Sequence, residues 1–208
     1  MTTSARLTRT RPAAPSSRRA LAAPALLAAP LFLLTAALLT WTNADTLRAW
    51  GWTAGDHHGI PWPSSLAVLP HGWLQAAAFA GTGVALIALA AAQPHRGRAL
   101  ALTACGIGLT AAAFPLDAPA GDAGTLGSWI HSWHGAVHAG GFLLAGLAAP
   151  LAIAATRHRT DLALAAALTI AALLGGTPGW YAYLTGVLAW IDVLAIRQLA
   201  APPAPRAL

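Results

Sequence analysis

The sequence predicts an all-α, polytopic membrane protein: a transmembrane bundle of six spans with both termini in the cytoplasm. Only 9% of the 208 residues are charged, 57% are hydrophobic, and the mean hydropathy is +0.59. Soluble domains carry about 25% charged residues, so this chain cannot cover a water-facing surface. The apolar residues also fall into long runs between short polar or basic segments, as membrane-spanning helices require.

Residues 1–19 contain five Arg and two Pro and are predicted to form a disordered basic cytoplasmic tail. Residues 20–42 then make a run of 23 residues without a charge, about 34 Å of helix. This run is too long for the apolar region of a signal peptide, so we expect it to remain as the first span. Pro24 and Pro30 are expected to kink it.

Residues 43–69 are polar and aromatic and are predicted to form an ordered outer loop with a short helix from Ser64. The third span should end before Pro115, which has no backbone N–H, and residues 117–127 should form a second outer loop. Residues 20–199 would thus be one transmembrane domain, and residues 200–208 a disordered Pro-rich tail. The further spans are expected at residues 70–92, 99–114, 128–156, 162–174 and 180–196.

The arginines predict the orientation. With six spans, eleven of the twelve Arg lie on one side of the membrane and only Arg48 lies on the other. Since positive segments stay in the cytoplasm, both termini are predicted to be cytoplasmic, in a plasma membrane. A basic chain can also suggest nucleic acid as a partner. Here the arginines form short clusters between apolar runs, so we predict contact with the lipid bilayer and no nucleic-acid binding.

Eight of the nine tryptophans lie in the predicted outer loops or at the outer ends of spans, and only Trp190 is deep. An aromatic belt at the membrane interface explains several of them. The predicted inner interface, however, has almost no tryptophan. Two interpretations therefore stay open: a membrane anchor, or an outward-facing surface that binds a small molecule, a lipid or a membrane-protein partner.

The fourth predicted span carries three histidines, His131, His134 and His138. Their spacing of i, i+3 and i+7 predicts one stripe along a helix. His134 and His138, one turn apart, could share a zinc ion if a further protein ligand joined them. The same histidines could instead line a polar vestibule or bond between helices. The other candidates for a ligand or for a wider outer binding site are His71, Asp56, His57, His58, Asp117 and Asp122.

Asp192 is the only acidic residue predicted to lie well inside a span. It stands about 18 Å along the sixth predicted helix, and His138 stands about 15 Å along the fourth. The two could therefore pair across the bundle and relay protons. Alternatively, Asp192 lies near the inner interface and contacts Arg197.

Two pairs of small residues with four-residue spacing occur in the second and fourth spans, Gly81/Ala85 and Gly141/Ala145. Small residues let helix backbones approach closely, so both pairs predict helix contacts. They concern packing rather than function.

Four features carry a resemblance to a known family: the long first outer loop, Phe114-Pro115-Leu116-Asp117 after the third span, a His shortly inside the fourth, and Trp190 with Arg197 in the last. On these features the sequence resembles domain-of-unknown-function 998, a family of bacterial and archaeal six-span membrane proteins, over about residues 20–199. Asp56-His57-His58 stands where that family's loop is more often rich in Ser and Asp. The resemblance implies six spans and no defined reaction.

That family is distantly similar to the Frag1-like and ceramidase-like multi-span proteins, some of which are zinc-dependent lipid amidases. Those hydrolases combine Ser-x-x-x-His in an early helix with a later His-x-x-x-His. His134 and His138 match the later element, and the first three predicted spans contain no Ser-x-x-x-His. Three functions therefore stay open: binding at the outer face, zinc-dependent hydrolysis, and proton-coupled transport through Asp192 and His138.

Overall fold

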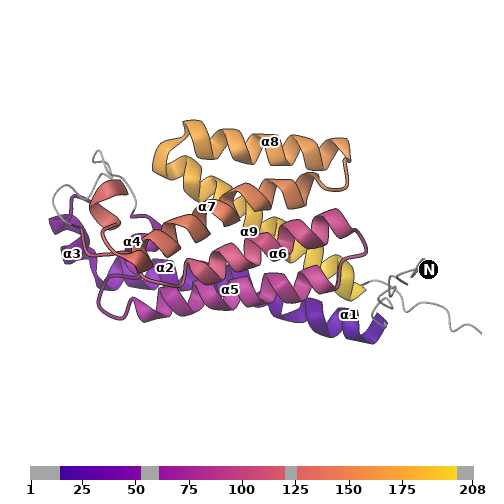
Figure 1. The fold of residues 1–208 in the computed structure, drawn as a ribbon, viewed down its shortest axis with the longest axis horizontal. Helices are drawn as coiled ribbons and strands as arrows, with labels where there is room; N and C mark the ends of the chain where they lie inside the picture. The colour runs from indigo at the N-terminus through magenta and orange to yellow at the C-terminus, as the bar shows by residue number, and fades with distance from the viewer. Residues whose placement is uncertain (1–14, 53–60, 120–125, 201–208) are drawn as a thin grey trace, which may run out of the picture.

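The computed structural model describes residues 15–52, 61–119 and 126–200, and every regular element in these ranges is helical (Figure 1). The predicted all-α class is confirmed. The helices follow one another as α1 (Pro15–Ala22), the 3-10 helix η1 (Ala23–Leu27), α2 (Ala28–Thr42), α3 (Ala44–Ala49), α4 (Pro63–Leu66), α5 (Trp73–Ala91), α6 (Arg96–Ala111), the 3-10 helix η2 (Leu126–Trp129), α7 (Trp133–Ala154), α8 (Arg159–Leu174) and α9 (Gly176–Ala200).

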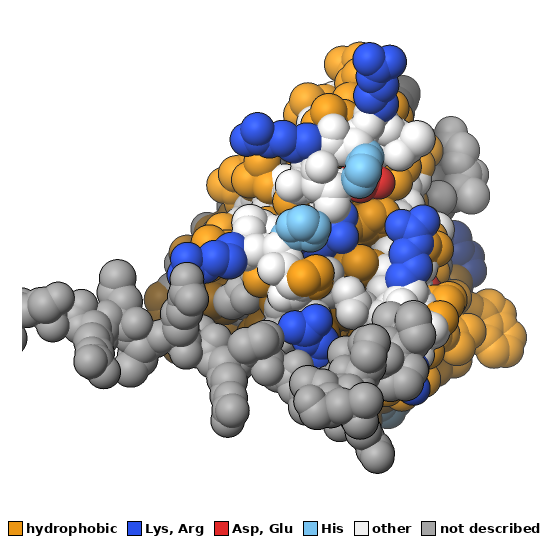
Figure 2. Space-filling model, turned by 90° about the vertical axis from the view of Figure 1, so that its right-hand side faces the viewer, with side chains coloured by type: hydrophobic (Ala, Val, Ile, Leu, Met, Phe, Trp, Pro, Cys, Tyr) orange, Lys and Arg blue, Asp and Glu red, His pale blue; other side chains and the backbone are white. Residues whose placement is uncertain are grey.

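The long helices form an antiparallel bundle. In Figure 1, α5, α7 and α9 run away from the end that carries α3 and α4, whereas α2, α6 and α8 run toward it. We call the end with α3, α4 and η2 the loop end, and the opposite end the basic end. Of the eight arginines in the described residues, only Arg48 on α3 lies at the loop end. Figure 2 looks onto the basic end and shows arginine side chains gathered there.

In the described part of the chain, four helical segments are long and apolar enough to cross a membrane, which indicates a multi-pass membrane protein. They are Ser17–Thr42, Trp73–Ala91, Trp133–Ala154 and Pro178–Ala200. Helices α6 and α8 have 16 residues each, about 24 Å, and are shorter than the hydrocarbon core of about 30 Å. Length and composition therefore identify four of the six predicted spans.

The first span is interrupted near Pro24. The 3-10 helix η1 separates α1 from α2, because proline supplies no N–H for an α-helical bond and its ring crowds the preceding turn. Helix α1 also begins before residue 20. Pro15 opens it, as proline often does in a first turn, so residues 15–19 of the predicted tail are helical.

The fourth span begins later than the sequence predicts. Helix α7 starts at Trp133 instead of residue 128, and Ser132 before it is extended, with φ −115° and ψ 167°. Ser132 caps the helix, because its Oγ accepts the N–H of Gly135 at 3.1 Å. His131 therefore lies outside the helix, and the expected stripe of three histidines is wrong for this residue. Only His134 and His138 share a helical face.

Apolar side chains gather in two clusters. The larger one lies within the bundle and includes Phe32, Phe79 and Leu86. The smaller one lies at the loop end, where Leu116 and Trp129 pack with apolar residues of α2, α3 and α4. The loop end is thus a folded cap with its own core, and it positions the segment between α6 and α7.

Helices α6 and α7 touch through glycine. A Cβ added at Gly108 would lie 2.5 Å from the carbonyl oxygen of Gly141, and a Cβ at Gly141 would lie 2.5 Å from that of Gly108. The predicted close contact at Gly141/Ala145 is confirmed. The matching prediction for Gly81 is not borne out within the described residues, since a Cβ added there meets no atom within 4 Å.

A polar network joins four helices at the basic end. Arg98 of α6 donates from Nε to the carbonyl oxygen of Ala152 on α7 at 3.3 Å, and its Nη2 lies 3.6 Å from Oδ2 of Asp161 on α8. Asp161 also accepts the hydroxyl of Thr156. The guanidinium carbon of Arg98 lies 5.5 Å from the ring centre of Trp190 on α9. Both Arg98 and Asp161 lie in the short polar segments between predicted spans, and the sequence alone does not predict that they meet.

Candidate functional site

The tryptophans of the loop end fall into two groups. In the first, Trp50 packs edge-on against Trp129 with ring centres 5.5 Å apart, and Trp52 packs against Trp62 at 5.8 Å. All four belong to or pack against the smaller apolar cluster, and Trp129 is fully buried. These side chains therefore stabilise the cap, rather than forming a surface for a ligand.

The second group is exposed. Trp41, Trp73 and Trp133 are 79%, 67% and 69% exposed. Trp41 stands at the end of α2, and the other two are the first residues of α5 and α7, so all three lie at the loop end of the bundle. Exposed tryptophans at one level are typical of a membrane interface. The aromatic belt thus accounts for these three, and it marks the level at which the candidate site lies.

Hydrogen bonds of Asp117 connect the segment after α6 to the residues before α7. Its Oδ2 accepts the backbone N–H of His131 at 2.6 Å and that of Ser132 at 2.8 Å. Its own backbone N–H donates to the carbonyl oxygen of Trp129 at 3.1 Å. A carboxylate at a helix N-terminus is also favoured by the helix dipole. Asp117 therefore has a structural role beside its predicted role as a ligand.

These bonds keep the Asp117 carboxylate ionised. The backbone N–H of His131 has the largest effect, followed by the side chain of Ser132, and the backbone N–H of Ser132 and the nearby His134 add to them. Together they outweigh partial burial and lower the pKa of Asp117 to about 2.

Both nearby histidines face this carboxylate. His134 Nε2 lies 3.5 Å from Asp117 Oδ1, and His131 Nδ1 lies 3.9 Å from Asp117 Oδ2. His134 Nδ1 lies 3.0 Å from the carbonyl oxygen of Pro115. A carbonyl only accepts, so Nδ1 of His134 must carry the proton in this contact. In the imidazolium form, Nε2 donates to the carboxylate and forms an ion pair with it. In the neutral form, Nε2 instead presents a lone pair to the carboxylate, and a donor placed between the two acceptors would bridge them.

His138 forms a hydrogen bond with the adjacent carbonyl and is more deeply buried than His134. It is 1% exposed, and its Nδ1 lies 2.6 Å from the carbonyl oxygen of Phe114. Its ring stacks on Phe142 and meets the edge of Phe79. Because Pro115 ends the helical path, the carbonyls after α6 have no partner in their own helix. His138 and His134 provide partners for the carbonyls of Phe114 and Pro115, respectively. The two Nδ1 atoms therefore bond to different carbonyls.

The predicted zinc site is incomplete in the part of the chain that the structure describes. No group of three or more His, Cys, Asp or Glu among residues 15–52, 61–119 and 126–200 is arranged to hold a metal. His71 stands before α5 with a φ of 62°, and no hydrogen bond or ion pair within these ranges joins it to Asp117. Four further candidates lie outside the described residues: Asp56, His57, His58 and Asp122.

Asp192 forms neither of its predicted pairs. No ion pair among the described residues joins it to His138 or Arg197, and its Oδ1 is buried without a hydrogen-bond partner. The expected common depth is wrong because both helices start elsewhere. Asp192 stands about 24 Å from the start of α9, near the basic end, whereas His138 stands about 8 Å from the start of α7.

Three polar residues within the bundle were not predicted from the sequence as candidate site residues. Gln75 is fully buried and accepts the hydroxyl of Thr35 at its Oε1, 3.2 Å away, which joins α5 to α2. Gln75 Nε2 and Thr82 Oγ1 are buried and have no hydrogen-bond partner within the described residues. A single Gln or Thr within an apolar run is the only signal that the sequence gives for them.

No family model, curated protein or solved structure matches this chain. The resemblance to domain-of-unknown-function 998 therefore stays a prediction. The class of the protein follows from its four long apolar helices, which indicate a multi-pass membrane protein in contact with the lipid bilayer.

Proposed function

We propose that this chain is a six-span protein of the plasma membrane, with cytoplasmic termini, that binds a lipid headgroup or small molecule at its outward-facing loop end. The binding residues are Asp117, His131 and His134. The observation that carries this proposal is the contact of Asp117 Oδ1 with His134 Nε2, 3.5 Å apart, at the end of the bundle that bears the exposed tryptophans. With a neutral His134, these two atoms are a pair of hydrogen-bond acceptors.

The directions of the helices support six spans. Helices α5, α7 and α9 all leave the loop end in the same direction, so the chain returns between them through α6 and α8 (Figure 1). A helix that returns over the same distance crosses the same layer, and a bilayer adapts to a short span at modest cost. Apolar side chains exposed on these two helices suit contact with lipid, namely Leu100, Ile107, Ile170, Leu173 and Leu174. The arginines of the basic end support its cytoplasmic assignment.

Cysteine labelling tests this topology. The chain has a single cysteine, Cys105, which is first replaced by alanine. In this background, we expect Asp45→Cys at the loop end to react with a membrane-impermeant maleimide in intact cells. Gly97→Cys at the basic end should react only after the membrane is permeabilised. Leu174→Cys, at the end of α8, should behave like Asp45→Cys. If Leu174→Cys instead needs permeabilisation, α8 does not span, and a reversed pattern at all three positions would place the termini outside.

The geometry of the acceptor pair defines the ligand chemistry. Two acceptors 3.5 Å apart are both satisfied by one N–H or O–H bearing group, and a primary ammonium adds charge attraction to Asp117. Trp133 lies beside His134 with ring centres 5.7 Å apart, and its exposed ring can contact a cation. An aminophospholipid headgroup and a soluble amine share this chemistry. The position beside the tryptophan belt favours the headgroup.

Nanodiscs of different composition test the ligand. We expect the unfolding temperature to be higher with phosphatidylethanolamine than with phosphatidylcholine, whose trimethylated ammonium has no N–H donor. His134→Leu should remove the difference, with affinity for the donor headgroup lowered about tenfold, as for one charge-assisted hydrogen bond.

The control is His158→Leu, an exposed histidine at the basic end, which should keep the difference. Ethanolamine added to phosphatidylcholine discs should raise the unfolding temperature only if the ligand is a soluble amine. A wild-type protein that responds to neither form of amine contradicts the proposal.

A further inference from the structure

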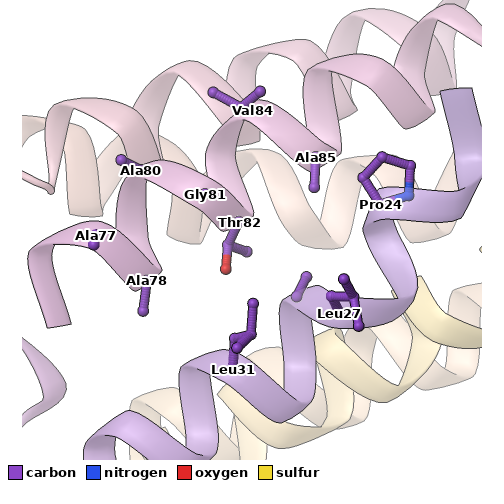
Figure 3. Close-up of a pocket in the computed structure, with 11 residues that line it drawn as sticks. Pro24, Leu27, Leu31, Ala77, Ala78, Ala80, Gly81, Thr82, Val84 and Ala85 are labelled. Atoms are coloured by element: carbon purple, nitrogen blue, oxygen red, sulfur yellow. The ribbon is translucent and has the colours of Figure 1, made fainter. Parts of the chain in front are cut away.

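A groove runs between α5 and the interrupted first span. Its volume is about 410 Å³, which lies within the range of small-molecule sites (Figure 3). Leu27 and Leu31 form one wall, and Ala77, Gly81 and Val84 of α5 form the other. Leu27, Leu31 and Val84 are exposed, so the groove opens sideways, toward lipid in the proposed topology.

Two local features keep the groove open. The 3-10 helix at Pro24 interrupts the regular packing of the first span along α5. On α5, the facing residues are small, and a Cβ added at Gly81 meets no atom of the described residues within 4 Å. Larger side chains at these positions would have filled the space.

The groove contains one unsatisfied polar group. Thr82 is 2% exposed, and its hydroxyl has no hydrogen-bond partner among the described residues. Figure 3 shows the hydroxyl oxygen directed into the groove. Thr82 stands about 14 Å along α5 from Trp73, well inside the hydrocarbon region. A buried hydroxyl without a partner is costly there, so an acceptor in the groove would be stabilised.

The position of Thr82 decides between three occupants. A helix of a second copy is about 10 Å wide, which is too wide to enter a groove of about 410 Å³ between two helices as far as Thr82. An ordinary acyl chain is slender enough, but its ester oxygens stay at the interface. A slender apolar molecule with a carbonyl oxygen inside the hydrocarbon region meets both requirements. We propose that this groove binds a lipid-soluble ketone- or quinone-type molecule, with Thr82 donating its hydroxyl hydrogen to the carbonyl oxygen.

A photoreactive ketone tests this site directly. 4-Dodecylbenzophenone carries both an apolar chain and a carbonyl that cross-links to C–H groups under ultraviolet light. In nanodiscs containing the full chain, we expect saturable cross-linking to peptides that include Leu27, Leu31 or Val84. Gly81→Leu should abolish this cross-linking by filling the groove. The matched control is Gly140→Leu on α7, also exposed and open to an added Cβ, and it should cross-link normally.

Two further comparisons test the hydrogen bond. Thr82→Val should raise the probe concentration needed for half-maximal cross-linking about threefold to tenfold, which is the effect of losing one neutral hydrogen bond. Thr103→Val is its control, because that hydroxyl already donates to the carbonyl oxygen of Ala99. 2-Hexadecanone should compete with the probe, and hexadecane should not.

Several results would overturn the inference. These are cross-linking that persists in Gly81→Leu, equal competition by the ketone and the alkane, and equal effects of the two threonine variants. A disulfide between two Gly81→Cys chains, formed in membranes in a Cys105→Ala background, would identify a second copy as the occupant instead. Unchanged thermal unfolding of Gly81→Leu, measured alongside, shows that the variant is folded.

Discussion

Replacing Gly108 or Gly141 with Ala is expected to cause a large loss of stability, because each glycine packs directly against the backbone of the other helix. The Cβ at Gly108 would lie 2.5 Å from Gly141 O and 2.6 Å from Ala145 N, and the Cβ at Gly141 would lie 2.5 Å from Gly108 O. The opposing atoms belong to the backbone, so no side chain can rotate away and α6 must separate from α7. Overpacking costs about 1–3 kcal/mol in general, and we expect the upper part of that range or more.

Gly140 provides a matched control for this contact, because it neighbours Gly141 and faces open space. A Cβ at Gly140 meets no atom of the described residues within 4 Å, so Gly140→Ala should be neutral or should stabilise the helix by up to about 1 kcal/mol. The unfolding temperature and the yield of folded protein in detergent would be compared for both variants. Equal effects of Gly140→Ala and Gly141→Ala would mean that the backbones of α6 and α7 do not touch there.

The two small-residue pairs illustrate what sequence alone can predict about packing. Gly81/Ala85 and Gly141/Ala145 have the same spacing in equally apolar runs. Among the described residues, however, Gly141 meets the backbone of another helix, whereas Gly81 faces the first span across a groove. Spacing is a property of one helix, whereas contact also depends on the position of another. The sequence therefore identified surfaces suitable for close packing and could not tell which of them is occupied.

Hydropathy was a reliable guide to helix type and a weaker guide to helix ends. An apolar run in lipid must satisfy its backbone internally, so the all-α class follows from composition. The start of α7 is different, because Asp117 accepts the N–H groups of residues 14 and 15 positions later and holds them outside the helix. A local pattern contains no sign of such a bond. For the same reason, the sequence selected His131, His134 and Asp117 as candidates without predicting how they meet.

Asp117→Asn is expected to lower stability at neutral pH. The amide oxygen can still accept the N–H groups of His131 and Ser132, which both bond to one oxygen of Asp117, but it carries no charge. Both hydrogen bonds and the attraction to the start of α7 are therefore weakened. The segment between α6 and α7 should loosen, and Trp129 should become more exposed to solvent. Thermal unfolding followed by tryptophan fluorescence would record both changes. Asp45→Asn is the control, since Asp45 is 93% exposed and its ion pair with Arg48 lies on the surface.

The acid dependence of stability distinguishes the Asp117 charge from a simple loss of packing. The pKa of Asp117 is lowered to about 2 in the folded protein, from an ordinary value of 3.8. Because the folded value is the lower one, the carboxylate stabilises the fold fully above its ordinary pKa, and this contribution is lost as the pH falls through 2. The unfolding temperature of the wild-type protein should therefore fall between about pH 4 and pH 2, and this component should be absent in Asp117→Asn. If both proteins lose stability equally over that window, the ionised carboxylate is not what holds the start of α7.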